Sequence, residues 1–117
     1  MASSAPALRL VVIESPYAGD VERNVRYARA AMADSLARGE APIASHLLYT
    51  QPGILRDSEV EEREFGIRAG LAWGARAELV AFYVDFGWSD GMRAALAHWK
   101  DRRLAIEKRQ LYTGEAP

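Results

Sequence analysis

Two short runs of the sequence are almost continuously apolar and rich in β-branched or aromatic residues. They are residues 8–13, LRLVVI, and residues 78–85, ELVAFYVD. An apolar side chain at nearly every position is characteristic of strands in parallel sheets that helices cover on both faces. These two runs therefore predict the central strands of an α/β fold.

The segments around these runs supply helices and further strands. Apolar residues recur at helical spacing over residues 20–38, and Gly39 follows where a helix commonly ends. We expect further helices over residues 58–74 and 89–100, a short strand that runs into a loop over residues 42–49, and a further strand over residues 104–111. Gly66 and Gly70 each cost the second helix about 1 kcal/mol relative to alanine, which predicts either close helix-to-sheet packing or a ligand on that face. The order of elements predicts one Rossmann-like (flavodoxin-like) domain, with a mainly parallel sheet of about four strands and helices on both faces.

Composition narrows the function classes. The chain has 117 residues, half of them hydrophobic, which suits a single domain; we expect it to span residues 8–111, with flexible tails at 1–7 and 112–117. The formal net charge of −1 argues against nucleic acid or an anionic membrane as partner. There is no cysteine, so thiolate chemistry is excluded and a cytoplasmic setting is expected. The spacing of the two histidines predicts no metal site, and we expect no cofactor.

Three loops follow the carboxyl ends of predicted strands, at residues 14–20, 46–57 and 85–90. In parallel α/β sheets these ends share one edge, and ligands bind there. At this edge Ser89-Asp90-Gly91-Met92 begins a helix, whose unpaired N–H groups favour an anion such as phosphate. The alternative is that Ser89 or Asp90 is an ordinary N-cap, and Asp90 disfavours a phosphate unless its side chain points away.

Other side chains near this edge have both functional and structural interpretations. Asp85 ends a buried strand, where a carboxylate can act on a ligand or cap the following turn. Glu62 lies in an acidic first helical turn, where it either faces the pocket or complements the helix dipole. His46 can bind a phosphate or a base edge, and Tyr17 and Trp88 can stack on a base.

The order of several segments resembles a known group of proteins. These segments are residues 12–19 (VIESPYAG), Asn24 with Tyr27, residues 42–48 (PIASHLL), residues 62–66 (EREFG) and residues 89–93 (SDGMR). The combination resembles small phage and bacterial proteins of uncharacterised function that are related in fold to the nucleoside 2-deoxyribosyltransferases. The resemblance covers residues 8–111 and implies a nucleoside or nucleotide ligand and a homodimer or higher homo-oligomer.

The resemblance also implies roles for particular residues. It places the base and sugar against Ser15 and Tyr17, the sugar near Asp85, and a phosphate near Ser89 and Gly91. The expected substrate-binding set is Ser15, Pro16, Tyr17, Asn24, His46, Trp88, Ser89, Asp90, Gly91 and Met92. The position of the glutamate nucleophile of that superfamily is Ala95, which cannot form a glycosyl ester.

Two functions therefore remain as the main hypotheses, with a purely structural oligomer whose pocket is vestigial as a third. The chain either cleaves or transfers at an N-glycosidic bond with a displaced carboxylate, for which Asp85 and Glu62 are the expected catalytic residues, or it is a non-catalytic nucleotide sensor or sequestering protein.

Overall fold

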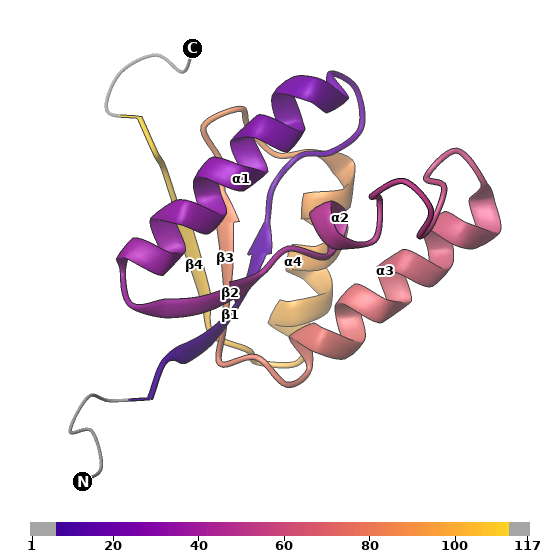
Figure 1. Ribbon diagram of the computed structural model, residues 1–117. Helices are drawn as coiled ribbons and strands as arrows, with labels where there is room; N and C mark the ends of the chain where they lie inside the picture. Colours follow the sequence, from indigo (N-terminus) through magenta and orange to yellow (C-terminus); the bar gives the residue numbers. More distant parts are fainter. Residues whose placement is uncertain (1–6, 113–117) are drawn as a thin grey trace, which may run out of the picture.

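The computed structural model describes residues 7–112 as one α/β unit (Figure 1). Its elements follow one another as β1 (Arg9–Glu14), α1 (Val21–Ala37), β2 (Glu40–Ile43), α2 (Ser45–Leu48), α3 (Val60–Gly74), β3 (Leu79–Tyr83), α4 (Asp90–Asp101) and β4 (Ile106–Arg109). The strands pair in parallel in the order β2-β1-β3-β4. The predicted single Rossmann-like domain with four parallel strands is confirmed.

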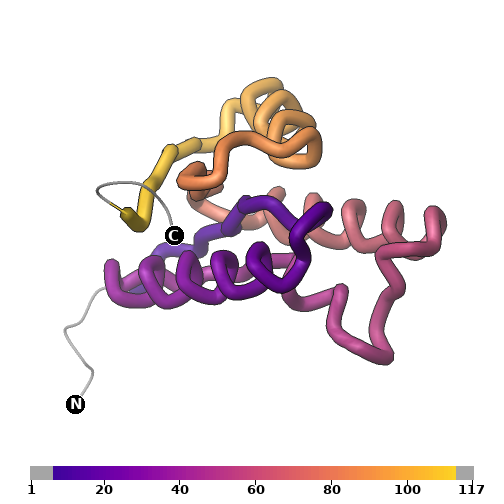
Figure 2. The backbone as a smooth tube through the Cα atoms, turned by 90° about the horizontal axis from the view of Figure 1, so that it is seen from above, coloured from indigo at the N-terminus to yellow at the C-terminus, as the bar shows by residue number. Residues whose placement is uncertain are grey.

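The two faces of the sheet separate into two cores because neighbouring residues of a strand point to opposite faces. Val11 and Ile13 of β1 pack with Tyr27 and Ala31 of α1. Val12 packs instead with Met92 and Trp99 of α4, and Leu71 of α3 joins this second core. Figure 2 shows α1 and α4 on opposite sides of the strands.

The segment predicted as a short strand that runs into a loop, residues 42–49, has a helical turn where the loop was expected. β2 ends at Ile43, and Ser45–Leu48 form one helical turn, in which the N–H groups of Leu47 and Leu48 both donate to the Ala44 carbonyl. The apolar residues of this segment suit a short strand and a helical turn equally well, so periodicity does not separate the two. The turn places Leu47 against the α1-side core.

The predicted tails lie mostly outside the described residues. Residues 1–6 and 113–117 are not described, and Tyr112, where the C-terminal tail was expected to begin, contacts the rest of the fold. The Tyr112 N–H donates to Asp85 Oδ2 at 3.0 Å, and the Tyr112 ring lies 6.4 Å from that of Tyr27. Within residues 7–112, no helix has the length and apolar character needed to cross a membrane.

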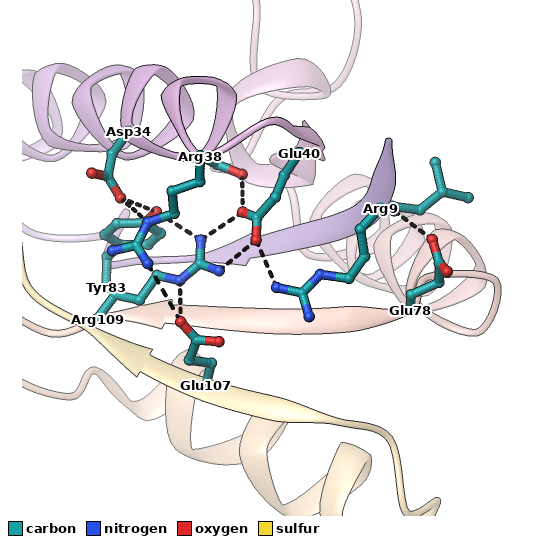
Figure 3. A network of polar contacts seen from close by, with 10 residues as sticks. Arg9, Asp34, Arg38, Glu40, Glu78, Tyr83, Glu107 and Arg109 are labelled. Atoms are coloured by element: carbon teal, nitrogen blue, oxygen red, sulfur yellow. Dashed lines mark hydrogen bonds and ion pairs between the residues drawn. The ribbon is translucent and has the colours of Figure 1, made fainter. Parts of the chain in front are cut away.

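A buried ion pair joins the two edge strands across the α1 face of the sheet (Figure 3). Both terminal nitrogens of Arg109 on β4 donate to the carboxylate of Glu40 on β2, each at 2.8 Å. Ser35 and Arg9 donate to the same carboxylate. Hydrogen bonds, first of all from Arg109, lower the pKa of Glu40 to about 2, and the bonds that Arg109 donates to Glu40 raise the pKa of Arg109. The pair is fully hydrogen-bonded, which is the condition under which a buried charge is tolerated.

Arg109→Met tests how much the fold depends on this pair. We expect the free energy of unfolding, measured by urea denaturation, to fall by about 3 kcal/mol, because the buried Glu40 carboxylate loses both hydrogen bonds from Arg109 and keeps only those from Ser35 and the half-exposed Arg9. The double variant Arg109→Met/Glu40→Leu should recover part of the loss. Arg29→Met, an exposed change on α1, should stay within about 0.5 kcal/mol of the unaltered chain. A loss below about 1 kcal/mol in Arg109→Met would contradict this interpretation.

Candidate functional site

A pocket of about 690 Å³ opens beside the carboxyl end of β1. Its wall is built from the loop after β1, α2 and the segment that follows it, one face of α3, and the first half of α4. Small-molecule sites are commonly about 300–1,000 Å³, and in sheets of this topology they lie where the chain leaves β1 and β3 toward opposite faces. The volume and the position are those of a ligand site.

Glu14, the last residue of β1, presents a carboxyl group to this pocket. In the sheet register Glu14 is the partner of Phe82, and Phe82 packs on the α4 side with Met92. Glu14 therefore lies on the sheet face that α4 covers, and Ala95 of α4 lines the same pocket. Burial raises the pKa of the Glu14 carboxyl to about 7. A carboxyl group with such a pKa exchanges its proton near neutral pH, as a general acid or base must.

Ser15 and His46 form a hydrogen-bonded pair next to Glu14. Ser15 Oγ and His46 Nε2 lie 2.7 Å apart, and both residues line the pocket. Burial lowers the pKa of His46 to about 4, so its imidazole is neutral at pH 7. A neutral imidazole and a hydroxyl can each donate and accept hydrogen bonds, which suits the polar edge of a base or the hydroxyl groups of a sugar.

The glycines of α3 allow α2 to pack closely against it. A Cβ atom at Gly70 would lie 2.5 Å from Ser45 Oγ, and one at Gly66 would lie 3.3 Å from Leu55. The expected close packing is therefore present, but its partners are α2 and the segment before α3 rather than the sheet. Gly66 and Gly70 also line the pocket, so the same approach shapes the ligand site.

The start of α4 contributes four of the expected residues, Ser89, Asp90, Gly91 and Met92, to the pocket wall. Ser89 is the N-cap, and its hydroxyl accepts a hydrogen bond from the Met92 N–H at 3.1 Å. Asp90 is exposed and lies 3.6 Å from Arg93. Met92 is almost fully buried in the α4-side core. Ser89 is thus an ordinary N-cap of α4, which was the alternative to a phosphate-binding role.

Four expected site residues lie outside the pocket wall, each with its own packing role. Asp85 accepts hydrogen bonds from Tyr27 and from the N–H groups of Leu111 and Tyr112, which anchor the segment after β4. The Asn24 amide donates to the carbonyls of Tyr17 and Ala18 and so supports the loop that carries Tyr17. Trp88 packs on Phe82, with ring centroids 5.0 Å apart, and Pro16 is buried.

Asp85 and Glu62, the two expected catalytic residues, differ in position, because Glu62 lines the pocket and Asp85 does not. Burial acts to raise the pKa of Asp85, but the hydrogen bonds from Tyr27 and three backbone N–H groups outweigh it and lower that pKa. Asp85 is therefore an ionised anchor away from the pocket. Glu62 does line the pocket, but its carboxylate accepts hydrogen bonds from the backbone and the guanidinium of Arg56, each at 2.9 Å.

Several wall residues were absent from the expected set. They are Glu14, Ser45, Tyr49, Thr50, Asp57 and His98. Glu14 carried a sequence signal, because it precedes Ser15 at the end of a buried strand. His98 lies one helical turn beyond Ala94, which also lines the pocket. Within the described residues, no three or more His, Asp or Glu side chains cluster as a metal site would require.

Glu14→Gln tests the burial of the Glu14 carboxyl group. The folded chain holds this proton more tightly than the unfolded chain, since the pKa rises from 4.5 to about 7, so stability falls as the pH increases from 4.5 to 7. We expect Glu14→Gln to be more stable than the unaltered chain by about 1–3 kcal/mol at pH 8 and to match it at pH 4. Urea unfolding at the two pH values measures this. An equal effect at both would contradict a raised pKa.

Comparisons with known proteins identify a family for this fold and pocket without giving an activity. Residues 9–109 match the family described as a domain of unknown function, DUF7768, so the match takes in every strand and helix and nearly all of the pocket wall. The chain matches no curated protein and no solved structure. Because the family match covers most of its length, the chain belongs to the DUF7768 family.

Proposed function

We propose that this protein binds a nucleoside or nucleotide in the pocket and cleaves or transfers at its N-glycosidic bond, with Glu14 as the catalytic carboxyl group. The observation that carries the proposal is the position of Glu14: a half-buried carboxyl group that lines the pocket on the sheet face that α4 covers, with its pKa raised to about 7 by desolvation. Ala95, where related transferases would be expected to have their nucleophile, lines the same pocket. Glu14 thus supplies a carboxyl group to the same pocket that Ala95 lines with a small side chain.

The reaction follows from general base chemistry. Ionised Glu14 removes a proton from a water molecule, and the water oxygen bonds to C1′ of the sugar as the C1′–N bond breaks. The bonding electron pair leaves with the base nitrogen. Where the nucleobase of the substrate is uncharged, its departing nitrogen also takes up a proton from solvent. The products are the free nucleobase and the free sugar. A second base in place of water would give transfer.

The other wall residues support binding rather than bond cleavage. Ser15 and His46 offer neutral hydrogen-bonding groups beside Glu14. Tyr17 lines the pocket from the first loop, and that loop is supported by Asn24. An aromatic ring and neutral hydrogen-bonding groups are what recognition of a base and sugar requires.

A non-catalytic ligand-binding protein is the second candidate, and a specific observation favours it. Asp85 is committed to hydrogen bonds outside the pocket, Glu62 is bound to Arg56, and Ala95 has no carboxyl group. If Glu14 only contributes to binding, the pocket would retain a nucleoside without cleaving it.

Release of free base separates these candidates. The purified chain is incubated with ribo- and deoxyribonucleosides, their 5′-monophosphates, 7-methylguanosine and nicotinamide riboside, and free base is measured by chromatography. We expect release whose rate rises about tenfold per pH unit below pH 7 and levels off above it, because Glu14 must be ionised to act as a base.

Glu14→Gln should lower this rate by about 100- to 10,000-fold. Glu64→Gln, which changes an exposed carboxylate of α3 outside the pocket wall, should leave it unchanged. Binding of a compound without any base release would favour the non-catalytic candidate. Absence of both would remove the proposal.

A further inference from the structure

The charged side chains that line the pocket are mostly acidic. Four carboxyl groups face it: Glu14, Asp57, Glu62 and Asp90. Among the wall residues of the described chain, Arg63 is the one side chain with a permanent positive charge. Arg56 offsets Glu62 and Arg93 lies near Asp90, but neither arginine belongs to the wall. With Glu14 about half ionised at pH 7 and these arginines close by, the pocket has a small excess of negative charge, although the chain as a whole is nearly neutral.

The two histidines of the wall do not reverse this balance. Burial lowers the pKa of His46 to about 4, and burial together with the charge of Arg102 lowers the pKa of His98. Both rings are thus mainly neutral at pH 7, and they add hydrogen-bonding groups rather than charge. They are also poor proton donors, so with Glu14 acting as the base neither histidine of the described wall serves as a strong acid to protonate a leaving base.

The start of α4 is already occupied by groups of the chain itself. The Ser89 hydroxyl accepts the Met92 N–H, and the Asp90 carboxylate lies in the first helical turn, where a negative charge complements the helix dipole. A phosphate at this position would meet the Asp90 carboxylate. The repulsion of like charges therefore disfavours a 5′-phosphate here.

We propose that the preferred ligand is an unphosphorylated nucleoside whose base carries a positive charge, such as a pyridinium or an N7-alkylated purine. This inference rests on the proposed function and names its substrate class. The acidic wall attracts such a base and repels a phosphate. A cationic base leaves with the bonding electron pair and becomes neutral, so its departure needs no proton and matches a pocket in which Glu14 acts as the base and neither histidine is a strong acid.

The experiment compares ligands that differ in one charge. Dissociation constants are measured by calorimetry at low temperature for guanosine, 7-methylguanosine and 7-methylguanosine 5′-monophosphate, with chromatography to verify that each stays intact. We expect 7-methylguanosine to bind at least about tenfold more tightly than both others at low salt, and we expect this preference to weaken as salt is added.

Matched variants assign the preference to the wall. Asp90→Asn should reduce the preference for 7-methylguanosine by about threefold. Glu22→Gln removes a carboxylate from the equivalent first turn of α1, outside the wall, and should leave the preference unchanged. If fluorescence-monitored melting shows that Asp90→Asn is unfolded, Asp57→Asn replaces it in the same comparison.

The outcomes distinguish this inference from the proposed function. Equal affinity for guanosine and 7-methylguanosine, or tighter binding of the monophosphate, overturns the charge preference while base release still stands. Failure of every nucleoside to bind, together with no base release, overturns the proposed function and this inference with it.

Discussion

The parallel pairing of β1 with β3 is the constraint on which the candidate site depends. The register places Glu14 beside Phe82 and so fixes which face of the sheet carries the Glu14 carboxyl group. Because side chains alternate along a strand, a shift by one residue would turn Glu14 toward α1 and bring Ile13 toward α4. Val11 and Ile13 on one face and Val12 on the other are all almost fully buried, so either shifted register would disrupt both cores.

Two glutamates of the sheet show how the same residue type acquires opposite properties. Glu40 is buried and accepts hydrogen bonds from Arg109, Arg9 and Ser35, and its pKa falls to about 2. Glu14 is half-buried and has no such donors within the described residues, and desolvation raises its pKa to about 7. The first arrangement stabilises the ionised form and joins the edge strands, whereas the second leaves a proton that exchanges near neutral pH. A carboxyl group kept at a cost to stability is characteristic of functional sites.

The sequence predicted the sheet well because β1 and β3 are apolar at nearly every position, a pattern with few structural alternatives. It predicted β2 and α2 poorly, since an apolar segment of a few residues fits a strand or a helical turn. In the sequence Asp85 and Glu14 each close an apolar run and look equivalent, although β3 itself ends at Tyr83, two residues before Asp85. Their difference arises from Tyr27 and from the N–H groups of Leu111 and Tyr112, which bind Asp85 from distant parts of the chain.

The position of Glu14 gives a structural reason why residue 95 of α4 need not carry a carboxylate. Both residues line one pocket, but Ala95 lies on α4 and Glu14 ends β1. A carboxyl group at the end of a central strand is held by the sheet itself, so its position is set by backbone hydrogen bonds rather than by a helix that can shift. A long acidic side chain at residue 95 would enter the pocket that Glu14 lines and would add a second negative charge to its wall. The small side chain of Ala95 therefore leaves both the room and the charge balance that a single carboxyl group with a raised pKa requires.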